Sequence, residues 1–307
     1  MFSRRWNSPA LPVFFAALAL TGTASAGDGV TETTVYGIAN FGGAGQCGTS
    51  DMTHTVHTDT AAAFKSPFDT YKAGGLWEVT RTVNNGSARG TYWTDDSQIP
   101  SCGSASCAPA DDVASGVDSA DVVYVHTHGY HNFDYFGWNG IPNLPQTPSN
   151  SGIVMGTSTY GCNVQTDNQF LFGNLDLNVA VVKACQSGDY DVWLDGGYWG
   201  MVSGEFTMWN AFHGDSSCDG SVTSYVGSYA SESFSDGIGE NWLDEAYDSW
   251  GADDCPVSIV YGSTAANRDS MYYNGGFRDL KNTGSKTGSS YYYVLGCSPD
   301  AGRTLPG

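Results

Sequence analysis

Two short apolar runs constrain the fold of this chain more than any other feature of its sequence. They are Asp121–His126 (DVVYVH) and Leu177–Ala184 (LNVAVVKA), and in both runs the apolar residues are mostly consecutive rather than alternating. Consecutive apolar residues indicate strands that are covered on both faces, which is typical of parallel sheets in α/β proteins. The two runs therefore predict the centre of a mostly parallel sheet.

Strand-like and helix-like segments alternate along the rest of the chain. Further strands are predicted at Val35–Phe41, Leu76–Val83, Gly152–Thr157, Val257–Tyr261 and Tyr291–Leu295. Helices are predicted at Thr60–Ala73 with an interruption at Pro67, and at Asp111–Ser119, Ser221–Glu232 and Gly239–Tyr247. Such alternation favours an α/β fold in which helices cover both faces of the sheet.

The N-terminus has the pattern of a cleavable export signal. Arg4 and Arg5 give it a positive start, and Leu11–Leu20 is apolar but too short to span a bilayer as a helix. Ala24-Ser25-Ala26 supplies the small residues that a signal peptidase accepts. We expect residues 1–26 to be removed and residues 27–307 to form one secreted or periplasmic domain.

The net charge of the chain limits the classes of partner that it can bind. There are 12 Lys and Arg residues against 32 Asp and Glu residues, a formal net charge of −20. So acidic a surface repels nucleic acid and anionic lipid, and we therefore expect neither a nucleic acid nor a membrane as partner.

No cofactor is predicted, and calcium is the one alternative left open. Three acidic pairs are candidate ligands for it: Asp95-Asp96, Asp111-Asp112 and Asp253-Asp254. None of the pairs has the spacing of a dedicated calcium loop, which favours solvated surface.

Eight cysteines follow the predicted cleavage site, at positions Cys47, Cys102, Cys107, Cys162, Cys185, Cys218, Cys255 and Cys297. In an oxidising compartment we expect most of them to be paired. Cys102 with Cys107 and Cys218 with Cys255 are plausible pairs, although connectivity does not follow from sequence alone.

Reactive side chains follow both of the central apolar runs. His128-Gly129 comes just after the first run, and Cys185 comes directly after the second. Functional sites of open α/β sheets gather at the carboxyl ends of parallel strands, so these two residues can meet in space. A thiol needs a base or a positive charge nearby to become a thiolate near neutral pH. The pair therefore predicts nucleophilic catalysis by a cysteine.

These two blocks resemble the caspase-like cysteine peptidases, the clan that also holds metacaspases, legumains and gingipains. In that family an apolar strand ends in His-Gly, and a later one ends in Ala-Cys or Asp-Cys followed by small residues. His128-Gly129 matches the first block, and Ala184-Cys185-Gln186-Ser187-Gly188 matches the second.

The resemblance implies a three-layer sandwich with a mostly parallel sheet. It further implies a secreted peptidase that acts on peptides or proteins, with Cys185 as nucleophile and His128 as general base and acid. The backbone N–H groups of Gly129 and Cys185 would form the oxyanion hole. Lys183 stands where metacaspases commonly have an acidic residue, so their preference for basic residues does not carry over.

The sequence offers three candidates for the substrate cleft. Asp189 and Asp191 lie just past Cys185 and could face a cationic side chain, or they could be solvated loop carboxylates. Trp209 could line the cleft or belong to the core. Among the histidines outside the proposed dyad, we expect His54 and His57 to be exposed to solvent and His131 and His213 to lie in loops.

Two alternatives to the peptidase remain. His126, His128 and His131 have the spacing H-x-H-x-x-H, which resembles the metal-binding strand end of metallo-β-lactamase-type hydrolases, although Tyr130 replaces the Asp usual before the third His. The other alternative is a catalytically inert secreted binding domain, which the 18 Tyr, 9 Trp and 40 Gly residues suggest. In that case Cys185 could be disulfide-bonded, for example to Cys162.

Overall fold

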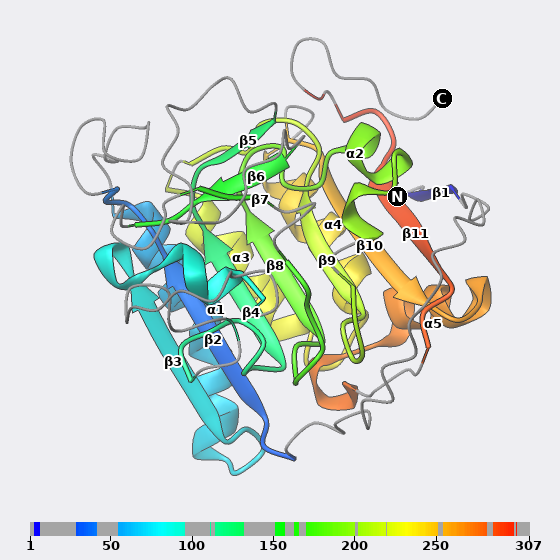
Figure 1. Cartoon of the computed structure of the whole chain (residues 1–307). Coiled ribbons are helices and arrows are strands. Elements are labelled where there is room, and N and C mark those ends of the chain that lie inside the picture. Colours follow the sequence, from blue (N-terminus) through cyan, green and yellow to red (C-terminus); the bar gives the residue numbers. More distant parts are fainter. Residues whose placement is uncertain are drawn as a thin grey trace, which may run out of the picture.

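The computed structural model describes residues 3–6, 29–41, 55–95, 111, 114–131, 151–156, 163–165, 170–199, 202–218, 220–250, 254–280, 285–297 and 299. Its main sheet contains β1 (Ser3–Trp6), β2 (Glu32–Gly37), β3 (Val79–Asn84), β4 (Val122–His126), β8 (Val179–Lys183), β9 (Met208–Phe212), β10 (Pro256–Gly262) and β11 (Gly288–Val294). The strand order is β1-β11-β10-β9-β8-β4-β2-β3 (Figure 1).

The two apolar runs form the centre of this sheet, as the sequence predicts. β4 and β8 are parallel neighbours, and every residue of both strands is buried. β3, β2, β4, β8 and β9 are all parallel, whereas β10, β11 and β1 continue the sheet in antiparallel pairs. Consecutive apolar side chains suit β4 and β8 because both faces of the sheet are covered at this point.

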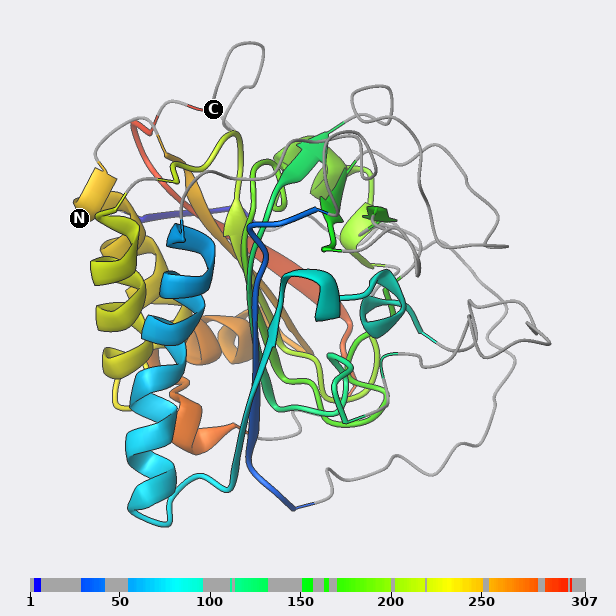
Figure 2. The ribbon, with the colours of Figure 1, turned by 90° about the vertical axis from the view of Figure 1, so that its left-hand side faces the viewer.

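Four helices cover one face of the sheet (Figure 2). They are α1 (Val56–Ala73), α3 (Val222–Glu232), α4 (Ile238–Trp250) and α5 (Ala265–Asn274). Aromatic rings make much of the contact: Phe64 of α1 stacks on Tyr124 of β4 with ring centroids 4.6 Å apart. Trp242 of α4 meets Phe212 of β9 edge to face at 5.2 Å. The expected α1 is confirmed, although Pro67 lies inside it without ending it.

The opposite face is covered by shorter elements. These are the helix α2 (Tyr190–Leu194), the 3-10 turns η1 (Asn85–Ser87), η2 (Gly90–Trp93) and η6 (Gly197–Trp199), and a small sheet of β5 (Gly129–His131), β6 (Ser151–Val154) and β7 (Asn163–Gln165). A further 3-10 turn, η8 (Phe277–Asp279), lies on the helix-covered face instead, where Phe277 packs on Phe68 of α1 with ring centroids 5.1 Å apart. Trp93 packs on Tyr36 at 5.3 Å, and Trp193 packs on Tyr291 at the same distance. The α/β fold and its three layers are therefore confirmed, with the long helices of the described chain gathered on one face.

The helix expected at Asp111–Ser119 is wrong for the residues that the structure describes there, which form turns. The cause is tertiary. The Asp118 carboxylate accepts hydrogen bonds from the backbone amides of Gly173, Leu175 and Leu177, at 2.7 to 3.0 Å. These bonds hold Asp118 against the chain that leads into β8. If this segment were helical, the Asp118 carboxylate would lie too far from the three amides to bond them.

β1 pairs with β11 at the edge of the sheet, with Ser3 opposite Val294. This strand lies within the predicted export signal, so removal of that signal would make β11 the edge strand. Among the described residues, no helix is both long enough and apolar enough to cross a membrane.

One disulfide in the described part of the chain joins Cys255 to Cys297, with Cα atoms 5.3 Å apart. It fastens the start of β10 to the residues just after β11. The expectation of disulfides is thereby confirmed, but the pairing of Cys218 with Cys255 is wrong. Cys102 and Cys107 lie outside the described residues.

The half-buried Asp121, just before β4, gives a stability prediction. Burial raises the pKa of Asp121 to about 7 from 3.8, the hydrogen bond from the Glu32 amide lowers it in part, and the nearby Asp176 charge raises it again. Between these two values the folded chain holds a proton that the unfolded chain has lost, so stability falls as pH rises through this window. Asp121→Asn should remove this fall in stability. The free energy of unfolding, measured by urea titration at about pH 4 and about pH 8, tests this.

The expected result is that Asp121→Asn gains free energy of unfolding relative to the original chain as pH rises. Asp236→Asn, at an exposed position, is the matched control and should not change the slope. Identical pH dependence in the Asp121 variant and the original chain would contradict the assignment.

Candidate active site

The parallel pairing of β4 and β8 brings the two predicted reactive blocks together. His126 lies opposite Lys183 in the register, and the Thr127 amide donates to the Lys183 carbonyl at 3.1 Å. One step further, Gly129 lies directly against Cys185: a methyl group on Gly129 would be 1.9 Å from the Cys185 carbonyl oxygen. β4 and β8 lie side by side (Figure 1), so His128-Gly129 and Cys185 follow the carboxyl ends of neighbouring strands.

Cys185 is a half-buried thiol and not part of a disulfide. Its Sγ accepts a hydrogen bond from the Ser216 amide at 3.4 Å, and its S–H donates to the Ser216 carbonyl at 3.8 Å. Burial raises the pKa of Cys185 to about 11, while the Ser216 amide and the Lys183 charge lower it in part. The group is therefore protonated near neutral pH and needs a base to become a nucleophile.

His128 is also half-buried. Its ring lies 5.1 Å from that of Phe41 and meets His57 edge to face at 6.2 Å, both measured between centroids. Burial lowers the pKa of His128, which favours the neutral imidazole. A neutral imidazole is the form that accepts a proton, so His128 is in the protonation state that a general base requires.

A second cluster lies beside this pair, formed by His57, His126 and Cys218. The rings of His57 and His126 are 3.9 Å apart, and Cys218 Sγ lies 3.6 Å from His126 Nε2. One ligand-type atom from each of the three residues lies within 4.8 Å of the other two. Histidine and cysteine side chains therefore gather at this edge of the sheet, some of them from positions that the sequence did not single out.

His57 is buried, so the expectation of an exposed side chain is wrong. Burial lowers the pKa of His57 to about 4, although the Ile38 carbonyl opposes this shift. A sequence signal for this position exists: the buried face of α1 carries His57, Thr60, Ala61, Phe64 and Phe68, which is helical spacing. The spacing is hard to recognise in the sequence because several threonines surround His57. Cys218 gave no comparable signal, because it lies in the loop between β9 and α3.

Of the three candidate cleft residues, Asp189 and Trp209 are fully buried. Asp189 begins α2, and its carboxylate accepts from the Asp191 amide at 2.8 Å. Trp209 is a core residue of β9 whose Nε1 donates to the Ser187 carbonyl at 2.9 Å. Neither therefore presents its side chain to a substrate, and they instead support the chain that follows Cys185. Asp191 is exposed on the first turn of α2.

The structure describes only part of the alternative metal site, the H-x-H-x-x-H set of His126, His128 and His131. His126 and His128 follow each other on one strand end, but the side chain of His131 lies outside the described residues, so that set stays a prediction. The same holds for Asp96, Asp112 and Asp253 of the acidic pairs. His213 lies in the loop just after β9, as expected, and is buried there, where its Nδ1 accepts from the Tyr190 amide at 3.1 Å. The loop expected at His131 is wrong, because this residue belongs to β5.

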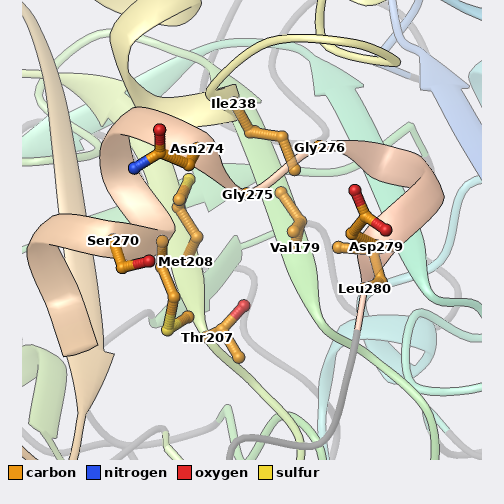
Figure 3. A pocket seen from close by; sticks show the side chains of 11 residues that line it. Val179, Thr207, Met208, Ile238, Ser270, Asn274, Gly275, Gly276, Asp279 and Leu280 are labelled. Atoms are coloured by element: carbon orange, nitrogen blue, oxygen red, sulfur yellow. The ribbon is translucent and has the colours of Figure 1, made fainter.

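A pocket of about 330 Å³ lies on the helix-covered face, between β8, β9 and α5 (Figure 3). Val179, Met208, Met271 and Asp279 are among its lining residues. Val179 begins β8 whereas Cys185 follows its end, so about 20 Å of strand separates the pocket from the thiol. The pocket is thus distinct from the candidate active site.

Comparisons with known proteins return no family model that matches the chain and no curated protein that matches it. The likeness to caspase-like peptidases therefore depends on the two strand-end blocks and their placement.

The contact between Gly129 and Cys185 gives a second prediction. Gly129→Ala should push the two strand ends apart, because the new methyl group would overlap the Cys185 carbonyl. We expect a loss of about 1 to 3 kcal/mol in the free energy of unfolding, as is usual for overpacking, measured by denaturant titration.

Gly220→Ala is the matched control, since nothing lies within 4 Å of a methyl group at that position. It should leave stability nearly unchanged. Equal stabilities for the two variants would show that the strand ends are not packed as described.

Proposed function

We propose that the protein is an exported cysteine peptidase of the caspase-like kind, in which Cys185 and His128 act as a dyad. One observation carries the proposal: the neighbouring parallel strands β4 and β8 are followed by His128-Gly129 and by Cys185, with Gly129 packed against the Cys185 backbone. Sites at the carboxyl ends of adjacent parallel strands are the rule in open α/β sheets.

The protonation states suit general-base activation. The Cys185 thiol transfers its proton to His128 as its sulfur attacks the carbonyl carbon of a peptide bond. The tetrahedral oxyanion is held by the backbone N–H groups of Gly129 and Cys185. His128 then gives the proton to the departing amine, which leaves a thioester on Cys185. Water, deprotonated by His128, hydrolyses this thioester and releases the acid product and the free thiol.

Among the described residues, the hydrogen-bond contacts of the Cys185 sulfur are with Ser216. Substrate binding therefore has to bring the thiol and the imidazole into proton-transfer distance, as is common when catalytic hydrogen bonds are loose in the free enzyme.

Lys183 is a positioning residue for this arrangement. Its ammonium group is buried and donates to the Ser217 carbonyl at 2.6 Å, next to the Ser216 backbone that contacts the thiol. The charge also lowers the pKa of Cys185. Lys183 thus holds the loop against the nucleophile and favours the thiolate when it forms.

The proposal requires an unpaired Cys185 in an oxidising compartment. The structure is consistent with this, since the Cys185 thiol remains while Cys255 and Cys297 form a disulfide. An inert binding domain would have no comparable need for a thiol at this edge.

Activity on peptides tests the dyad. The mature chain, residues 27–307, is incubated with a mixed peptide library and the products are identified by mass spectrometry. Cys185→Ala should reduce cleavage to background, because no other group takes over the attack. His128→Ala should reduce kcat/KM by about 10²- to 10⁴-fold, the usual contribution of a general base.

Both variants should keep the melting temperature of the original chain within a few degrees, since both side chains are only half-buried. Cys185→Ser, which keeps the shape of the side chain, gives a second inactive variant. Full cleavage by a folded Cys185→Ala variant would refute the proposal.

A further inference from the structure

We propose that His57, His126 and Cys218 form a zinc-binding site that joins α1, β4 and the loop after β9. This site is separate from the Cys185–His128 pair and from the H-x-H-x-x-H set, with which it shares only His126. Its three candidate ligand atoms lie within 4.8 Å of one another.

The hydrogen bonding of His57 indicates a ring prepared to act as a ligand. Its Nδ1 contacts the carbonyl oxygen of Ile38, which can only accept, so this nitrogen carries the hydrogen. The lone pair is then on Nε2. That atom is buried and has no hydrogen-bond partner, in a residue that is only 1% exposed. A buried acceptor without a partner is costly and calls for an explanation.

His126 is oriented in the same way by Thr60. The Thr60 hydroxyl donates its only hydrogen to the His57 carbonyl at 3.0 Å, so it accepts from His126 Nδ1, 2.7 Å away. The lone pair of His126 is therefore also on Nε2, which faces Cys218. Histidines that bind metals usually donate their other N–H to a carbonyl or a similar oxygen, which fixes the ring and its tautomer.

The distances suit zinc. With Zn–N of about 2.0 to 2.1 Å and Zn–S of about 2.3 Å, a tetrahedral site places nitrogen and sulfur about 3.6 Å apart. Cys218 Sγ and His126 Nε2 are 3.6 Å apart. The three ligand atoms lie at most 4.8 Å apart, so metal binding requires side chains to move inward by up to about 1 Å.

The donor set selects the metal. Two imidazoles and one thiolate suit borderline-soft zinc, whereas calcium and magnesium prefer oxygen. The buried ammonium group of Lys183 is near enough to lower the pKa of His57 and His126, and its charge therefore repels a metal cation. The negative charge of a Cys218 thiolate offsets this repulsion. Three protein ligands leave a fourth position for water or another donor.

Without a metal, the same contacts have a different explanation. The Cys218 thiol would donate to His126 Nε2, and His57 Nε2 would remain buried without a partner. This arrangement predicts no metal binding, so it is the outcome that opposes the proposal.

Metal binding can be measured without any activity assay. The mature chain is stripped with chelator, titrated with Co²⁺ and followed by absorption spectroscopy. We expect one Co²⁺ per chain, visible bands of tetrahedral cobalt, a near-ultraviolet sulfur-to-cobalt charge-transfer band, and displacement of the cobalt by Zn²⁺. Zn²⁺ alone should raise the melting temperature.

Substitutions identify the ligands. Cys218→Ser should abolish the charge-transfer band, whereas the matched control Cys185→Ser should keep it. Thr60→Val should weaken zinc binding by about 10- to 100-fold, the usual effect of removing a group that orients a ligand.

Absence of cobalt binding to the folded chain, or a charge-transfer band that persists in Cys218→Ser, would overturn the proposal. Because metal binding is measured directly, the experiment decides the question whether or not the protein cleaves peptides.

Discussion

The parallel pairing of β4 with β8 is the interaction on which the rest of the structure depends. It places two fully buried strands at the centre of the sheet and ends both at one edge. The chain beyond β4 then packs so closely on the chain beyond β8 that position 129 has no room for a side chain. The pairing also explains why reactive side chains gather at the carboxyl ends of these strands. Histidine and cysteine residues from four separate segments of the chain lie there.

Burial sets the chemical state of these side chains. It raises the pKa of Cys185 and lowers the pKa of His57, His126 and His128, so neutral thiol and neutral imidazoles are favoured together. A neutral pair requires the imidazole to take the thiol proton as the sulfur attacks. Neutral imidazoles are also the form that binds metals. These protonation states are the ones that the proposed dyad and the proposed metal site both require.

The sequence predicted the centre of the fold well, because consecutive apolar residues in β4 and β8 reflect burial on both faces. By the same reasoning it predicted that the chain after β4 and the chain after β8 are neighbours, which the contact of Gly129 with the Cys185 backbone confirms. It failed where tertiary contacts override local pattern, as at Asp118, whose carboxylate binds three distant amides. His57 and Cys218 were missed because their partners come from other segments, and no local spacing encodes a cluster built from a helix, a strand end and a loop.

The most direct test of the central claim is to find which thiol reacts as the nucleophile. The chain from residue 27 to residue 307 is treated with a peptide that carries a thiol-reactive electrophile in place of the scissile bond, and the modified residue is mapped by mass spectrometry. We predict a single adduct on Cys185, formed faster than with a simple alkylating agent and slowed in His128→Ala. Modification of Cys218 instead, or equal rates with and without His128, would contradict the dyad.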